Sequence, residues 1–450
     1  MFKKIEIWIV YLVSVVFLVF LILYGAVLRS NYVKSDLLKF AQPAAVFLAE
    51  IPSNLVALFE ISNRNEIYVK PEEVYVAANP KAQIISNDSF NLEVFNDHKK
   101  GFILTAAQNI QLNQPSIFLF DLKKNKIVYE WNVKIQDIEN FLNINSPDQP
   151  WRMQHPLLLE NGEIVFTHGE GPLVKIGACS DIIWAKDGVY HHSINFNDTN
   201  KNEIIVPSIY SDSSYLNNYY DVTSNIRDDS FEIINIDSGE TLSEVSILKT
   251  LLESGLEDIV TLVIAHSYDP IHLNDAEPIL QSDDYFNSGD IIFSSRHLNA
   301  IGAIRPKTPE LLFLKQGLFS MQHDIDYQGE GVFTFYGNNN RINQEALQEF
   351  ARIYSYDFKN DKLISLYNLG YIDNNSSIQN PTQGLHKIIS EQATFIDTST
   401  QAIIFNNYLE TTFNLTVQLP NNRYSALSWS RYYDNLDFLN EDFFNIDCQK

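Results

Sequence analysis

Polar and apolar residues alternate along most of this chain in short runs, and the runs come in pairs separated by polar turns. A period of two predicts β-strands, and pairs joined by Asn, Asp or Gly predict β-hairpins. Five such hairpins begin beside a histidine, at Gln154, His191, His272, Gln322 and Leu385. A sixth hairpin, from Ser89, carries its histidine in the turn, at His98.

Two more strand-like runs follow each hairpin, so the pattern predicts six units of four strands. After Gln322, for example, these runs are "RIYSYDF" and "LISLYNL", joined by "KNDK". Repeated four-stranded units are typical of β-propellers. We therefore expect an all-β fold, a six-bladed β-propeller over residues 75–450, whose equivalent positions converge on one axis. The longest interruption, residues 208–266, is expected to hold a helix near residues 243–252.

The N-terminal segment has a different pattern. Residues 7–28 carry no charge and follow Lys3 and Lys4. As a helix, this segment is long enough to cross a bilayer core of roughly 30 Å. We predict a transmembrane signal anchor over residues 1–30 and a helical or irregular linker over residues 31–74. A cleaved signal peptide is the alternative, although "YGAVLRS" offers only a poor cleavage site. Both interpretations place the propeller outside the cytoplasm, in the periplasm.

Charge and composition narrow the function. The formal net charge is −24, from 32 Lys and Arg against 56 Asp and Glu, which argues against nucleic-acid partners. Cys179 and Cys448 lie far apart without zinc-site spacing, so the sequence predicts no disulfide framework and gives no redox compartment. Motifs of serine hydrolases, zinc proteases and phosphate-binding loops are absent from the sequence. We expect no metal and no cofactor.

The starts of the hairpins supply the candidate chemistry. First strands lie nearest a propeller axis, so their ends are expected to bring together His192 or His191, His272, Arg296 and His323. Asn274 shares a strand face with His272. Arginine offers a fork of donors and histidine exchanges a proton near neutral pH, which together suit a compact oxyanion.

Each of these residues also has a structural interpretation. His323 can simply line the channel and bond to a carbonyl group, and Arg296 can pair with one of the many carboxylates. His272 and Asn274 can cap strand ends. Between the two neighbouring histidines, the alignment with other blade starts favours His192 over His191. The other histidines at or near strand ends are interpreted as structural. His155 and His386 are expected to be pocket walls, and the others are His168, His266 and His297.

These residues and their spacing resemble the bacterial aryl sulfotransferase family, whose members use no nucleotide sulfate donor. The resemblance covers most of the chain from about residue 85 and implies a six-bladed propeller with a central channel. His323, in "MQHDID", matches the family's transiently sulfated histidine. His272 and Asn274, in "HLND", match its His-x-Asn motif. Arg296, in "SSRH", matches its arginine, and His192 or its neighbour His191 matches a further histidine. The separate N-terminal β-domain of soluble members has no counterpart in this sequence.

The resemblance implies a sulfuryl transfer between two small molecules. A neutral His323 would attack the sulfur of an aryl sulfate, release a phenol and pass the sulfuryl group to an acceptor phenol. Arg296, His272 and His192 would balance charge, and one histidine would protonate the leaving phenolate. Asn274 and His191 are the expected substrate-binding residues. The alternatives are a propeller that only binds an anionic or phenolic ligand, and an aryl sulfate hydrolase.

Overall fold

The computed structural model describes residues 7–32, 41, 45, 68–69, 81–144, 151–199, 201–219, 226–264, 268–339, 350–373, 383–420 and 423–448. The chain divides into two compact units, Met1–Arg64 and Asn65–Lys450. Most of the predicted linker, residues 31–74, lies outside the described residues, and so does His266.

The first unit contains the long helix α1 (Ile7–Tyr32). Its apolar side chains are exposed on all sides, among them Trp8, Phe17 and Leu18. A helix that is apolar all round needs a lipid or protein environment. The segment Ile7–Arg29 is long and apolar enough to cross a membrane, a property that signal sequences share. The helix therefore agrees with a membrane anchor or a signal sequence.

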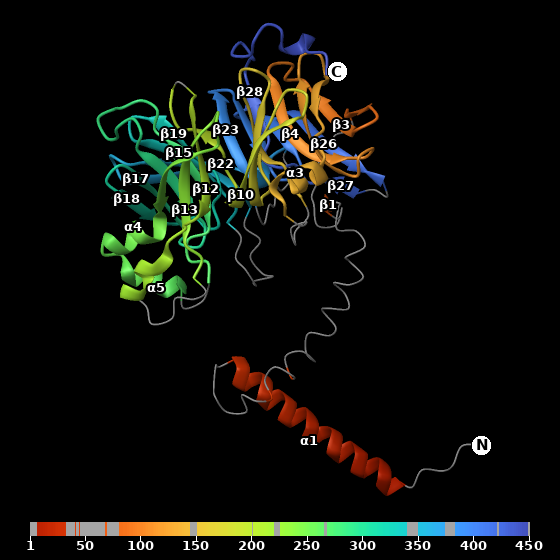
Figure 1. Cartoon of the computed structure of the whole chain (residues 1–450), viewed down its shortest axis with the longest axis vertical. Helices are drawn as coiled ribbons and strands as arrows, with labels where there is room; N and C mark the ends of the chain where they lie inside the picture. The colour runs from red at the N-terminus through yellow and green to blue at the C-terminus, as the bar shows by residue number, and fades with distance from the viewer. Residues whose placement is uncertain are drawn as a thin grey trace, which may run out of the picture. The chain divides into compact units, whose positions relative to one another are not determined.

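The second unit is all-β and is built from six antiparallel sheets (Figure 1). Blade 1 contains β28 (Arg431–Tyr433), β4 (Phe102–Asn109), β5 (Gln114–Asp121) and β6 (Lys126–Trp131). Blade 2 contains β7 (Gln154–Leu158), β8 (Ile164–Thr167), β9 (Glu170–Ile176) and β10 (Ile182–His191). Blade 3 contains β11 (Asn195–Phe196), β12 (Glu203–Ile209), β13 (Asp229–Asn235) and β14 (Thr241–Ser246).

Blade 4 contains β15 (Leu273–Pro278), β16 (Ile291–Ser295), β17 (Ala300–Arg305) and β18 (Glu310–Gln316). Blade 5 contains β19 (Ile325–Gly329), β20 (Val332–Gly337), β21 (Arg352–Asp357) and β22 (Lys362–Asn368). The remaining sheet, called sheet 6, begins with β23 (Leu385–Ser390), β24 (Ala393–Asp397), β25 (Ala402–Phe405) and β26 (Thr411–Leu419). Its eight strands are completed by β27 (Arg423–Ser425), β1 (Tyr68–Val69), β2 (Gln83–Ser86) and β3 (Asn91–Asn96).

The sheets are held in a ring by hydrophobic clusters, each of which lies between two neighbours. Leu104 and Trp131 of blade 1 share a cluster with Phe166 of blade 2, and the pairing continues around the ring. Phe395 of sheet 6 and Phe118 of blade 1 share the cluster that closes it. Each buried Phe or Leu contributes roughly 1.5–3 kcal/mol of transfer free energy. The predicted β-propeller is thereby confirmed.

The predicted number of regular blades is wrong. We expected six blades of four strands, whereas five sheets have this form and sheet 6 has eight strands. The run from Ser89 was expected to form a hairpin, but β3 pairs with β26, with Leu415 opposite Val94. The place beside β4 is taken by β28, with Arg431 opposite Leu104. Ring closure pairs strands from opposite ends of the chain, and local alternation carries no information about such partners.

Short helices occupy the connections. α4 (Ile247–Glu253) and α5 (Glu257–Ile264) lie beside blade 3 (Figure 1). The helix predicted near residues 243–252 therefore exists but begins later, because Ser246 ends β14 and its Oγ caps α4 by accepting from Lys249 N at 2.9 Å. In the described part of the second unit, the other helices are α3 (Ile135–Leu142) and the 3₁₀ turns η4 (Ser213–Asn218), η5 (Leu369–Tyr371) and η7 (Phe443–Asn445).

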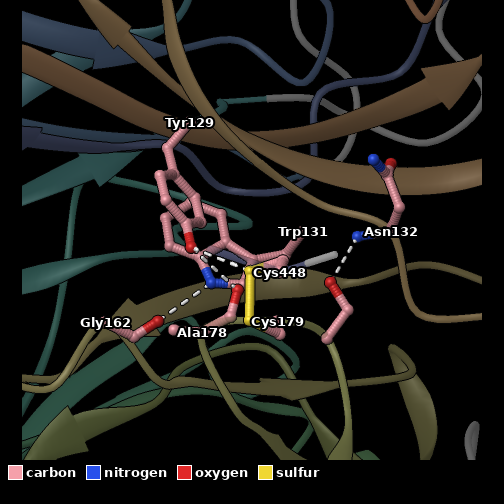
Figure 2. Close-up of a disulfide and its surroundings, with 8 residues drawn as sticks. Tyr129, Trp131, Asn132, Gly162, Ala178, Cys179 and Cys448 are labelled. Atoms are coloured by element: carbon pink, nitrogen blue, oxygen red, sulfur yellow. Dashed lines mark hydrogen bonds between the residues drawn. A yellow bond between two sulfur atoms is a disulfide. The ribbon is translucent and has the colours of Figure 1, made fainter. Parts of the chain in front are cut away.

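A disulfide joins Cys179 to Cys448, with the two Cα atoms 5.2 Å apart (Figure 2). Cys179 lies in the turn between β9 and β10, so the bond ties the C-terminal tail to blade 2. Tyr129 packs beside it and donates a hydrogen bond from its hydroxyl to Ala178 O at 3.1 Å (Figure 2). This pairing was not predicted from the sequence, because the two cysteines are 269 residues apart.

Candidate active site

A cavity of about 310 Å³ gathers all four predicted catalytic residues. Its lining residues are Arg152, Gln154, His168, Gly169, Glu170, His192, His272, Arg296, His323 and Gln383. They come from blades 2 to 5 and from the start of sheet 6, so the cavity lies where the sheets converge.

A repeated backbone feature brings the side chains there. At or shortly before the first strand of every sheet, one residue that is not glycine has a left-handed backbone: Trp429, His155, His192, His272, Met321 and Gln383. Their φ values run from 47° to 64°. Such residues are uncommon, and histidine is among the types enriched in this region. Two of these residues, His192 and His272, are predicted site residues.

His323 is fixed as a neutral imidazole. Its Nδ1 lies 2.7 Å from Asn338 Oδ1 and 3.0 Å from Met321 O, both of which are acceptors. Nδ1 therefore carries the hydrogen, and Nε2 accepts from the backbone N–H of Gln383 at 2.9 Å. Burial, reinforced by the charge of Arg296, lowers the pKa of His323 to about 3. The lone pair on Nε2 is thus present across the physiological pH range.

His272 belongs to a charged network on blade 4. Its Nδ1 lies 2.5 Å from Asp269 Oδ2, and its Nε2 lies 3.4 Å from Arg296 Nη1. Burial alone would raise the pKa of Asp269, but the hydrogen bond and charge of His272 and the charge of Arg227 outweigh it and hold that pKa below its usual value. Asp269 is therefore an ionised carboxylate that orients His272. The ring of His297 packs 4.5 Å from that of His272, centroid to centroid.

The geometry shows which of the neighbouring histidines, His191 or His192, lines the cavity. His192 lines the cavity, with its ring centroid 5.5 Å from that of His272 and 6.0 Å from that of His323. His191 is fully buried, does not line the cavity and places its Nδ1 2.8 Å from Nδ1 of His192. Burial, together with the charges of His191 and His272, lowers the pKa of His192 well below its usual value. His192 is the member of the doublet that reaches the other site residues.

Asn274 is fully buried and does not line the cavity. Its Nδ2 donates to the carbonyl oxygen of Gln322 at 2.7 Å. It therefore fixes the backbone directly before His323. Both expected substrate-binding residues, Asn274 and His191, lie one layer behind the cavity wall.

Several functional candidates were missed in the sequence. Arg152, Gln154 and Gln383 line the cavity, and His168, which was interpreted as structural, lines it too. Asn338, which holds His323, was also missed. A positional signal was available for two of them: His168 follows β8 and Asn338 follows β20, as Arg296 follows β16.

A second cavity, of about 340 Å³, is acidic. His155 and His386, predicted as pocket walls, line it together with Asp275, Glu277, Asp324, Asp326 and Arg431, among others. Burial, with repulsion from Asp324, raises the pKa of Asp275 to about 7. The ring of Trp429 packs against histidines of both cavities: it lies 5.4 Å from His155 and 5.7 and 6.1 Å from His192 and His323, centroid to centroid.

Among the residues that the structure describes, two groups of side chains have spacing that suits a metal ion. In each, the ligand atoms lie within 4.8 Å of one another, and the groups are Asp269, His272 and His297, and Asp324, Asp326 and His386. In both groups hydrogen bonds already account for the arrangement. His386, for example, bonds to Asp324 through Nδ1 and contacts Thr334 Oγ1 at 2.8 Å through Nε2.

The sequence profile of the arylsulfotransferase (ASST) family matches residues 154–416, which include every predicted site residue. The chain belongs to the arylsulfotransferase family. Arg152, which lines the cavity, and Trp429, whose ring packs against His192 and His323, lie outside the matched residues. No curated protein matches the chain.

Three of the solved structures that are similar to this chain share little sequence with it. A protein of unknown function from Bacteroides caccae is 10% identical, with a TM-score of 0.48, over 75% of this chain and 100% of that one. The Pan2 WD40 domain of Neurospora crassa is 10% identical, with a TM-score of 0.37, over 82% and 95%. The Cps50 (Swd1) β-propeller domain of Myceliophteria thermophila is 6% identical, with a TM-score of 0.42, over 77% and 98%.

Proposed function

We propose that this protein transfers a sulfuryl group from an aryl sulfate to a phenol through a sulfated His323. The observation that carries the proposal is the fixed tautomer of His323, whose Nδ1–H is held by Asn338 while Nε2 keeps its lone pair. A neutral nitrogen nucleophile beside an arginine and two further histidines suits attack on an anionic ester.

In the first half-reaction, His323 Nε2 forms a bond to sulfur while the sulfur–oxygen bond to the aryl group breaks. The electron pair leaves with the phenolate. Gln383 N–H donates a hydrogen bond to Nε2 at 2.9 Å, and this bond must break before the attack. Arg296 and His192 would stabilise the sulfuryl oxygens, since both line the same cavity.

His272 is the proposed acid and base. Asp269 holds its Nδ1–H, and Arg296 Nη1, which can only donate, lies 3.4 Å from its Nε2. This contact with Arg296 must break before Nε2 carries a proton that can pass to the departing phenolate. In the second half-reaction, the acceptor phenol loses its proton to His272 and its oxygen attacks the sulfated His323. The roles of Asn274 and His191 become positional: Asn274 holds the backbone before His323, and His191 orients His192.

We also propose that α1 is a retained signal anchor and that the propeller lies in the periplasm. The disulfide between Cys179 and Cys448 supports this location, because such bonds persist mainly in oxidising compartments.

The test uses the full-length protein in detergent micelles and 4-nitrophenyl sulfate, with and without phenol. Release of 4-nitrophenol that rises with phenol supports transfer, whereas release independent of phenol indicates a hydrolase. No release indicates a binding protein. His323→Gln should lower activity at least about a thousandfold, with His98→Gln, a histidine outside the cavity, as the matched control. Mass spectrometry should find a sulfuryl adduct of roughly 80 Da on the His323 peptide. Full activity in His323→Gln contradicts the proposal.

A further inference from the structure

One wall of the cavity has no part in the proposed sulfuryl transfer. It comes from blade 2, where Arg152 precedes β7 and His168 follows β8. His192, His272, Arg296 and His323 come from blades 3 to 5. The cavity thus has two polar walls of separate origin in the chain.

His168 presents an unpartnered donor. Its Nδ1 accepts from the backbone N–H of Arg152 at 3.2 Å, so its Nε2 carries the hydrogen. That Nε2 is buried and has no hydrogen-bond partner among the described residues. Trp151 stacks on the ring with centroids 4.2 Å apart and fixes its plane. A buried donor without a partner costs about 1–3 kcal/mol, a cost that a ligand removes when it accepts the hydrogen bond.

Arg152 presents an unpartnered charge beside it. Within the described part of the chain, its guanidinium makes no hydrogen bond and no ion pair. The charge of Glu170 acts on Arg152, but Glu170 Oε1 forms its ion pair with Arg227 Nη1, at 3.0 Å. Arg227 thereby offsets the repulsion that Glu170 would exert on an anion.

The backbone leaves room for a ligand between these groups. Gly169 lines the cavity with a φ of 109°, and a Cβ there would lie 3.3 Å from Gln154 Oε1 and 3.5 Å from Arg152 Cδ. A side chain at this position would crowd Gln154 Oε1 and contact Arg152 Cδ, and its backbone conformation would be strained. Glycine keeps that side of the cavity open.

We propose that Arg152 and His168 bind a carboxylate on the aromatic substrate, so that the preferred donors and acceptors are hydroxyaryl carboxylic acids and their sulfate esters. This inference rests on the proposed function for the identity of the aromatic group. The planar guanidinium fork matches a carboxylate in two hydrogen bonds, and His168 Nε2–H supplies a third donor. In a chain of net charge −24, a pair of donors without carboxylate partners is suited to an incoming anion.

The experiment measures binding, so that it does not depend on turnover. Isothermal titration calorimetry of the full-length protein in micelles compares 4-hydroxybenzoate with its neutral analogue 4-hydroxybenzamide. The wild type should bind the carboxylate about tenfold more tightly or better. Arg152→Gln should remove this difference, and His168→Gln should reduce it. Arg296→Gln, on the other wall, should keep it.

Equal affinity for the two ligands, no binding of either, or a preference that survives Arg152→Gln overturns the inference. Thermal melting of each variant checks that it is folded. Failure of the proposed function has a different signature, the absence of phenol-dependent release and of the adduct on His323. The two failures are therefore distinguishable.

Discussion

Asn338 provides the most direct test of how His323 is prepared for attack. Its Oδ1 lies 2.7 Å from His323 Nδ1, and its side chain is fully enclosed. Asn338→Ala removes this acceptor and leaves only Met321 O, at 3.0 Å, for the Nδ1 hydrogen. Losing the partner of a buried donor costs about 1–3 kcal/mol, and the remaining carbonyl favours the lower half of that range. We expect kcat/KM to fall about 5- to 30-fold.

The pH dependence separates this role from a purely structural one. The Asn338 hydrogen bond opposes the lowering of the His323 pKa to about 3, so its loss moves that pKa further down. His323 then stays neutral at every pH above 4, and the fold-loss should be the same from pH 5 to 8. For stability, the folded-state pKa lies below the unfolded value of about 6.5. His323 therefore costs no stability above pH 6.5, and the stability of the folded state falls as the pH drops from 6.5 toward 3, because the unfolded chain binds the proton first.

The assay is the phenol-dependent release of 4-nitrophenol from 4-nitrophenyl sulfate, measured across pH for the wild type and two variants. The matched control is Asn339→Gly, because Asn339 is the adjacent buried amide and bonds to Tyr354 Oη instead of His323. Glycine is chosen because Asn339 has a φ of 55°. If both variants lose activity equally, or if the Asn338→Ala loss changes with pH, the assigned tautomer is wrong.

Two further predictions follow from the packing and the disulfide. Trp429→Ala should open a path between the two cavities and raise the ratio of phenol-independent hydrolysis to transfer. Trp429→Phe should keep that ratio. An unchanged ratio in both variants contradicts the prediction that Trp429 separates the cavities. Because Trp→Ala in a core costs about 3–5 kcal/mol, melting temperatures must accompany this comparison. In cells, Cys179 and Cys448 should react with a thiol reagent only after reduction, and labelling without reduction argues against the periplasmic location.

The fold was predictable wherever strand neighbours are also sequence neighbours. The alternating runs of blades 2 to 5 form sheets in chain order, from β7 to β22. The prediction fails at the ring closure, where β3 pairs with β26 instead of β4, and β28 pairs with β4. Nothing in a local pattern distinguishes a strand that pairs with the next strand from one that pairs with the far end of the chain.

The gathering of the candidate residues at one cavity was predictable to the extent that their positions repeat with the blades. His272 and His323 stand at blade starts, and Arg296 follows a second strand. Asp269 and Arg152 lie in the segments before first strands, where no periodicity marks them. Their roles depend on contacts across segments, such as the Asp269 bond to His272, and on burial.

The left-handed blade starts connect the fold to the chemistry. A left-handed residue other than glycine costs roughly 1–2 kcal/mol, and glycine would avoid that cost. The chain nevertheless places histidines at three of these starts: His155, His192 and His272. His192 and His272 meet at the first cavity, and His155 lines the second. The hydrophobic clusters between neighbouring sheets hold the ring together, so the fold can retain the strain of these left-handed histidines. Glycine would remove the strain, but it has no side chain that could bind an anion or move a proton.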